Sequence, residues 1–144
     1  MKKGTFIRTQ ADLDTIIANE NFKPIRYCSV GGDVIIFENC YINPNGDIIR
    51  ISNYIEKYGY EITARLTRAD LLAGSVNNAG YVLVGIAGKS FTLHRLVAST
   101  FLKDDPDKRE IDHLDCNKLN NKVTNLEYVT RKENPRRWRA RKGE

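Results

Sequence analysis

The polar segment EIDHLDCNKLNNKVTNLEYVTRKEN, residues 110–134, contains two aspartates, one histidine and five asparagines. Its pattern predicts a strand, a long polar loop, a second strand and then a helix with Thr130 as the N-cap. Because adjacent strand residues point to opposite faces, Asp112 and His113 project on opposite sides of the first strand, and Asn134 lies near the first turn of the helix. This arrangement can bring a carboxylate and an amide oxygen to one cation, with an imidazole facing a neighbouring point.

The elements that must position this segment are short and of mixed type. Thr9 as an N-cap and the helical spacing of Leu13, Ile16 and Ile17 predict a helix near residues 10–18. β-Branched runs bounded by glycines and by the turn at 43–46 predict a small N-terminal sheet, and a hairpin and a short amphipathic helix precede the polar segment. The predicted strands are residues 25–30, 32–37, 46–52, 80–86, 90–95, 110–115 and 126–130, with helices at 95–102 and, as a single turn, at 67–74.

Composition indicates one compact globular protein. The chain has 144 residues, of which 41% are hydrophobic. No run approaches the roughly 18 apolar residues of a membrane span, and the N-terminus becomes polar too soon for a secretory signal. Cys28, Cys40 and Cys116 are widely spaced without a C-x-x-C pair, which favours reduced thiols over disulfides or structural zinc. We therefore expect a cytoplasmic protein that has no membrane partner and no structural zinc.

Positive charge is concentrated at the C-terminal end. Residues 131–144 carry a net charge of +5, which equals the net charge of the whole chain. A basic segment around one tryptophan, directly after the polar segment, indicates an element that follows phosphates. A solvated C-terminus is the alternative interpretation. The candidate DNA-binding residues in this tail are Arg131, Lys132, Arg136, Arg137, Arg139 and Arg141, together with Lys142.

The segment DHLDCNKLNNKVTNLEYVTRKEN resembles the HNH motif of the His-Me finger, or ββα-metal, nucleases, in particular the HNH homing endonucleases common in phages and mobile introns. The block GYVLVGIAGKSFTLHRLVASTF is similar to the hairpin and helix that precede the motif in that family, and residues 22–52 resemble its small N-terminal module more loosely. The resemblance implies an α+β fold. It also implies a small N-terminal β-rich module (1–75), followed by a C-terminal ββα-metal (HNH) nuclease domain with a basic tail (76–144), in a protein encoded by a phage or mobile element.

Position by position, the resemblance implies that His113 is the general base, that Asp112 and Asn134 hold one divalent metal, and that Asn125 fixes the loop and orients His113. Histidine titrates near neutrality, so it can take the proton of the attacking water. Oxygen ligands suit Mg²⁺ or Mn²⁺, which can act as a Lewis acid on a phosphodiester. The expected activity is metal-dependent hydrolysis of DNA to 5′-phosphate and 3′-hydroxyl ends, by nicking or double-strand cutting, in a monomer or homodimer.

Other polar residues receive simpler interpretations. The asparagines at 117, 120 and 121 are expected to form turns, because asparagine side chains bond nearby backbone and tolerate left-handed conformations. His94 is expected to be structural, with a DNA contact as the alternative, and Arg95 is a candidate phosphate contact. Two positions differ from the family pattern. Cys116 stands where a glycine is common, and Pro135 follows Asn134 and disfavours helical geometry there.

Two other functions remain open from the sequence alone. The protein could be a catalytically silent DNA-binding module that keeps the fold, or a regulatory protein that uses the basic tail. Metal-dependent cleavage of plasmid DNA distinguishes the nuclease from both.

Overall fold

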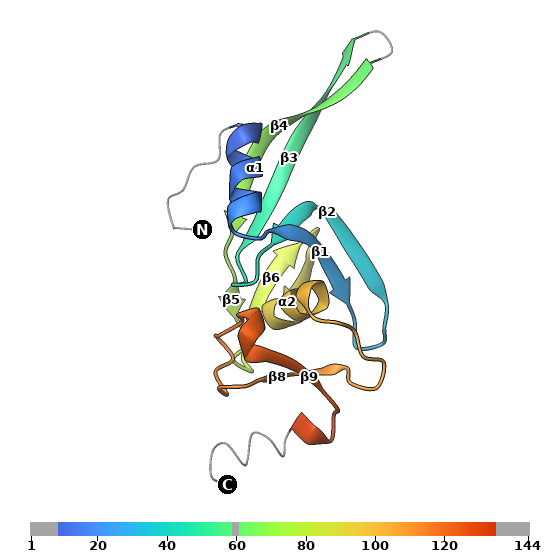
Figure 1. Ribbon diagram of the computed structural model, residues 1–144, viewed down its shortest axis with the longest axis vertical. Coiled ribbons are helices and arrows are strands. Elements are labelled where there is room, and N and C mark those ends of the chain that lie inside the picture. The colour runs from blue at the N-terminus through green and yellow to red at the C-terminus, as the bar shows by residue number, and fades with distance from the viewer. Residues whose placement is uncertain (1–8, 59–60, 135–144) are drawn as a thin grey trace.

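The N-terminal half is built on a four-stranded antiparallel sheet. The computed structural model describes residues 9–58 and 61–134, with side chains described outside 53–70. The sheet follows the chain in the order β1-β2-β3-β4. Its elements are α1 (Gln10–Asn19), β1 (Lys23–Cys28), β2 (Val34–Ile42), β3 (Ile48–Tyr58) and β4 (Glu61–Leu72). The hairpin of β3 and β4 extends away from the rest of the molecule (Figure 1).

Helix α1 confirms the helix predicted near residues 10–18. Thr9 is its N-cap, with an extended backbone and a side-chain oxygen that accepts from the backbone N–H of Asp12 at 3.1 Å. Leu13 is the buried residue of the helix, and it packs with Phe22 and Ile49 in a small apolar cluster. The cluster joins α1 to the sheet.

Strand β4 corrects the prediction of a helical turn at residues 67–74. Residues 67–72 belong to a long strand that pairs with β3 from Tyr58↔Glu61 to Ile48↔Leu72. Each residue of β3 has a cross-strand partner on β4. Cross-strand pairing therefore overrides local helix propensity here.

The C-terminal half has the predicted hairpin, helix and two further strands, but the helix begins at Leu93, inside the strand predicted for residues 90–95, and a short strand lies at Ser75–Val76. Its elements are β5 (Ser75–Val76), β6 (Val82–Ile86), β7 (Lys89–Thr92), α2 (Leu93–Phe101), β8 (Glu110–His113), a 3₁₀ turn (Val123–Asn125) and β9 (Leu126–Val129). Strands β5, β6 and β7 form one antiparallel sheet, and β8 pairs with β9 in another. The fold is therefore of mixed α and β type, as expected.

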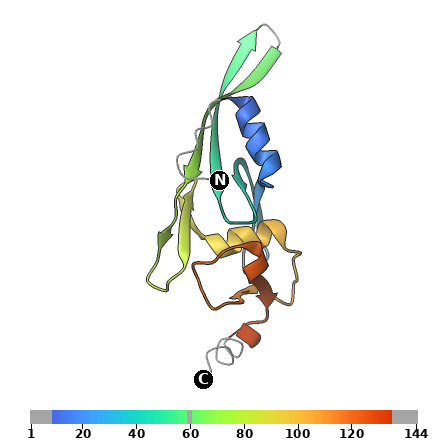
Figure 2. The same cartoon turned by 60° about the vertical axis from the view of Figure 1, so that its left-hand side comes forward.

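Helix α2 is the central packing element. It contacts β1 of the N-terminal sheet as well as β6, β7, β8 and β9, and it lies between the N-terminal strands and the β8–β9 hairpin (Figure 2). Burial of an aliphatic side chain stabilises a fold by about 1.5–3 kcal/mol, and both Leu96 and Val97 of α2 are fully buried. Arg26 of β1 adds a polar connection, because its guanidinium donates to the Asp104 carboxylate and to the Ser99 carbonyl.

The main apolar core crosses the expected module boundary near residue 75. Ile25, Ile42 and Ile48 from the first half pack in one cluster with Val84 and Leu126 from the second. The N-terminal sheet is thus part of the platform on which the polar segment rests.

Candidate active site

The predicted first strand of the polar segment is β8, and it pairs antiparallel with β9. The register places Asp112 opposite Glu127 and His113 opposite Leu126. Both central side chains are buried, with Asp112 0% and His113 1% exposed. A carboxylate and an imidazole withdrawn from bulk solvent are costly unless they have partners, so their surroundings determine what the pair can do.

The ring of His113 contacts a side chain from the loop between the two strands. Its Nε2 lies 2.9 Å from Oδ1 of Asn121. Asn121 is itself only 4% exposed. The sequence predicted Asn121 to be a turn former, and its hydrogen bond to the candidate base is a second role that the turn propensity of asparagine does not reveal.

Two more aromatic rings surround His113. The His94 ring centroid lies 5.0 Å from that of His113 in an edge-on arrangement, and the Tyr81 centroid lies 6.1 Å from it. Tyr81 also stacks on His94 at 5.0 Å. Burial, followed by the nearby His113 and Arg95, lowers the pKa of His94 to about 3. His94 is therefore neutral over the working range of pH, and its ring forms part of the wall of the site.

Asn125 closes the loop rather than touching the histidine ring. Its side-chain nitrogen donates to Asp115 and to the Asn120 carbonyl, both at 2.9 Å, and its Oδ1 accepts from the backbone N–H of Asp115 at 3.0 Å. Hydrogen bonds from the Asn120 side chain, the Asn117 backbone and the Asn125 side chain keep the pKa of Asp115 below its usual value. The expected fixing of the loop by Asn125 thus has a direct structural basis, while the contact with the base comes from Asn121.

Cys116 adopts the conformation that makes glycine common at its position. Its φ is +61°, in the left-handed region, and its backbone N–H donates to the His113 carbonyl at 2.9 Å. A residue with a Cβ is disfavoured there by about 1–2 kcal/mol. The tight turn after His113 therefore forms in spite of the side chain.

The loop is also fastened to the N-terminal half. The backbone N–H of Val123 donates to the Pro44 carbonyl at 2.8 Å. Pro44 belongs to the turn between β2 and β3, which Asn43 stabilises by accepting from the backbone N–H groups of Asn45 and Asp47. Gly46 of this turn has a φ of +90°, and a Cβ on it would lie 3.7 Å from the Asn121 carbonyl oxygen. The N-terminal turn thus supports the loop that carries Asn121.

The second proposed metal ligand lies where a helix begins after β9. Thr130 Oγ1 accepts from the Glu133 N–H at 3.1 Å, and the Thr130 carbonyl accepts from the Asn134 N–H at 3.3 Å. These contacts match the predicted N-cap. Within the described residues, Oδ1 of Asn134 is buried and has no hydrogen-bond partner. A buried amide oxygen without a donor is a suitable ligand for a hard cation. Pro135 lies outside the described residues.

The described residues contain no group of three or more His, Cys, Asp or Glu side chains that could hold a metal ion. The ligand set expected from the sequence is of another kind, because it combines the Asp112 carboxylate with the Asn134 amide. One carboxylate and one neutral amide leave a divalent cation net positive, which favours a phosphate.

The candidate DNA contacts fall into three groups. Arg95, a candidate phosphate contact, is only 8% exposed and donates to the Arg109 carbonyl at 2.8 Å. Its guanidinium ties α2 to the segment before β8. Arg131 and Lys132 are exposed just before the helical turn that contains Asn134. The remaining basic candidates, Arg136, Arg137, Arg139, Arg141 and Lys142, lie outside the described residues.

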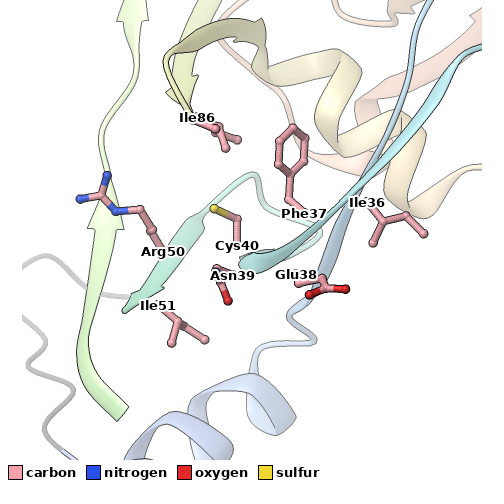
Figure 3. Close-up of a pocket in the computed structure, with 9 residues that line it drawn as sticks. Ile36, Phe37, Glu38, Asn39, Cys40, Arg50, Ile51 and Ile86 are labelled. Atoms are coloured by element: carbon pink, nitrogen blue, oxygen red, sulfur yellow. The ribbon is translucent and has the colours of Figure 1, made fainter. Parts of the chain in front are cut away.

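A surface pocket of about 520 Å³ lies away from the polar segment. Phe37 and Cys40 of β2 and Ile86 of β6 line it, and Arg50 of β3 stands at its side (Figure 3). None of its lining residues belongs to residues 110–134. Pocket size therefore does not identify the candidate site, which is defined by buried polar groups on β8, β9 and the loop between them.

The described part of the chain contains no helix long and apolar enough to cross a membrane.

Comparison with known proteins supports the expected family. Residues 91–136 match the HNH endonuclease family. A putative HNH homing endonuclease, YosQ, from the SPbeta prophage of Bacillus subtilis (strain 168) is 45% identical over 60 residues, which are 38% of this chain and 35% of that protein. The DNA endonuclease I-HmuI of Bacillus phage SP01 is 44% identical over 59 residues, which are 38% of this chain and 34% of that protein.

A longer match is to an uncharacterised HNH endonuclease of Acanthamoeba polyphaga mimivirus, which is 36% identical over 88 residues, or 58% of this chain and 26% of that protein. This chain thus spans about a quarter to a third of the length of these relatives. A solved structure that describes DNA binding and cleavage by the HNH homing endonuclease I-HmuI matches with a TM-score of 0.56 and 26% identity, over 75% of this chain and 56% of that one. The residues that match the HNH endonuclease family, 91–136, include Asp112, His113, Asn125 and Asn134.

Proposed function

We propose that the protein is a metal-dependent DNA endonuclease that hydrolyses phosphodiester bonds at the β8–β9 hairpin. The observation that carries the proposal is the buried Asp112–His113 step on β8. The Oδ1 of Asn134, after β9, is buried without a hydrogen-bond partner among the described residues, and this adds a candidate metal ligand. The match to the HNH endonuclease family supports it, as does the similarity to the HNH homing endonuclease I-HmuI, which binds and cleaves DNA.

His113 acts as the general base in this proposal. Its ring lies against Tyr81 and His94, which shield it from bulk water. One of its ring nitrogens forms a hydrogen bond with Asn121. The other nitrogen can accept a proton from water as that water attacks the phosphorus atom. General-base catalysis of this kind contributes about 10²- to 10⁴-fold to a rate.

Asp112 and Asn134 would hold the cation, through a carboxylate oxygen and Oδ1. When bound, one Mg²⁺ or Mn²⁺ supplies Lewis-acid stabilisation of the charge that develops on the phosphate and on the leaving oxygen. Asp112 contributes the negative charge that attracts the ion, and Asn134 contributes a ligand without cancelling more of its charge. Departure of the 3′-oxygen then leaves a 3′-hydroxyl end and a 5′-phosphate end.

Asn125 and the basic residues have supporting roles. Asn125 fixes the loop between β8 and β9 through Asp115 and Asn120. Arg131 and Lys132, together with the basic residues from 136 onward, contact DNA phosphates. Such contacts position the duplex but carry no sequence information by themselves.

A supercoiled-plasmid assay tests the proposal. We expect nicked or linear DNA in Mg²⁺ or Mn²⁺ and none in EDTA, with His113→Ala as the control for a contaminating nuclease. DNA binding without cleavage in either metal would support a catalytically silent module instead. Gel filtration of the same samples tests the expectation of a monomer or homodimer.

A further inference from the structure

We propose that Asn121 is a positioning residue that keeps the proton of neutral His113 on Nε2, so that Nδ1 is the nitrogen that accepts the proton from water. The inference rests on the proposed role of His113 as the general base. It assigns a function to a residue that the sequence interprets only as a turn former, and it names the reacting atom of the base.

The hydrogen bond between His113 and Asn121 determines which ring nitrogen carries the proton. Nε2 of His113 lies 2.9 Å from an amide oxygen, which can only accept a hydrogen bond. Two lone pairs at this distance would repel each other, so Nε2 must carry the proton. Because Asn121 and His113 are 4% and 1% exposed, water cannot easily replace this bond. The tautomer of a histidine is set by the hydrogen bond of its other nitrogen, and in a neutral ring Nδ1 then has the free lone pair.

Asn121 is held firmly enough to impose this choice. The side chain of Asn125 donates to the Asn120 carbonyl at 2.9 Å, and the Asn125 backbone N–H donates to the Lys122 carbonyl at 2.9 Å. These two carbonyls belong to the residues on either side of Asn121. Asn125 therefore orients His113 indirectly. It holds the backbone on both sides of Asn121, and Asn121 contacts the imidazole.

The same hydrogen bond also selects the orientation of the ring. A half-turn of the imidazole about its Cβ–Cγ bond would exchange Nε2 with Cε1 and Nδ1 with Cδ2, so a carbon atom would face Oδ1 of Asn121 and the hydrogen bond would be lost. The rings of His94 and Tyr81, with centroids 5.0 and 6.1 Å from that of His113, lie beside the imidazole in this orientation.

Nuclear magnetic resonance can read the tautomer directly, because the chain has two histidines. Long-range ¹H–¹⁵N spectra distinguish a protonated ring nitrogen from an unprotonated one. Where the spectrum shows a neutral His113 ring, we expect the pure Nε2–H form in the wild type. Asn121→Asp keeps an acceptor oxygen and should retain that form. Asn121→Leu should give shifts averaged between the two tautomers, and the control Asn117→Ala, in the same loop but without contact to His113, should match the wild type.

Cleavage measured on the same proteins connects the tautomer to catalysis. For Asn121→Leu we expect kcat to fall by about 10²-fold or more, since misplacement of a catalytic group costs this much, with DNA affinity in Ca²⁺ unchanged. Asn121→Asp should cleave faster than Asn121→Leu. An Nδ1–H form in the wild type, or a pure Nε2–H form in Asn121→Leu, would overturn the inference whether or not the protein cleaves DNA. A wild type that shows the expected tautomer but cleaves no DNA would sink the nuclease proposal instead.

Discussion

At the residue scale, the neighbours Asp112 and His113 are assigned different tasks. His113→Ala removes the proton acceptor and leaves both proposed metal ligands, so we expect metal and DNA binding to persist while cleavage falls by about 10²- to 10⁴-fold. Asp112→Ala deletes the one charged ligand, so activity should fall together with metal affinity, and added Mn²⁺ should restore part of it. Two measurements distinguish the variants: the cleavage rate as a function of metal concentration, and the DNA affinity in Ca²⁺.

The exposed turn residue Asp107 offers a matched control, because Asp107→Ala removes a carboxylate without touching β8. Near wild-type cleavage by His113→Ala would show that the general base is a different group. If both Asp112→Ala and His113→Ala cleave normally, the site lies elsewhere in the chain.

His94 predicts how stability depends on pH. Its pKa is about 3 in the folded protein, against 6.5 for an ordinary histidine. The unfolded chain therefore binds more protons between these values, so this contribution to stability is complete above about pH 6.5 and is lost as the pH falls toward about 3. The slope is at most about 1.4 kcal/mol per pH unit. Denaturant unfolding of the wild type and of His94→Phe, from neutral to acid pH, measures this dependence of stability on pH.

His94→Phe keeps a ring against Tyr81 and His113 but cannot take up a proton. We expect its free energy of unfolding to fall less steeply with acid than that of the wild type. Parallel curves for the two proteins would mean that His94 is not held neutral by burial.

At the element scale, the short helical start after β9 determines where Asn134 lies. Thr130 Oγ1 accepts from the Glu133 N–H at 3.1 Å, and loss of an N-cap costs about 0.5–2 kcal/mol. Thr130→Val keeps the shape and loses the acceptor, so we expect metal affinity to fall by up to about tenfold, the equivalent of about 1.4 kcal/mol. Thr130→Ser keeps the hydroxyl and is the matched control. Calorimetric Mn²⁺ titration measures both, and equal affinities would exclude a role of the cap in placing Asn134.

At the scale of the whole molecule, the net charge of +5 equals the charge of residues 131–144. If the tail binds duplex phosphates, the logarithm of DNA affinity should fall with the logarithm of salt concentration by about 0.9 for each phosphate neutralised. Truncation after Asn134 should flatten this slope, and so should a full-length variant with the five basic residues of 136–142 changed to glutamine. A slope that neither change alters would favour the solvated-terminus interpretation.

The sequence by itself determined the features that depend on local pattern. The strand, loop and strand around Asp112 and His113, the amphipathic helix observed at Leu93–Phe101 and the N-cap at Thr9 all follow from alternation, helical spacing or capping chemistry. The absence of glycine at Cys116 suggested a locally different loop, but Cys116 adopts the positive φ that favours glycine. These features involve residues close together in the chain, and short-range sterics and hydrogen bonds decide them.

Only the tertiary structure decided which of several similar residues makes each contact. Residues 67–72 became strand because β3 offers a pairing edge. Of the asparagines in the loop, Asn121 reaches His113, because the turn at 43–46 holds the loop against the first half of the protein. Arg95 points into the interior and bonds to the Arg109 carbonyl instead of facing solvent. Such choices depend on contacts between segments distant in the chain, and packing of the whole core, which local sequence patterns do not encode, determines them.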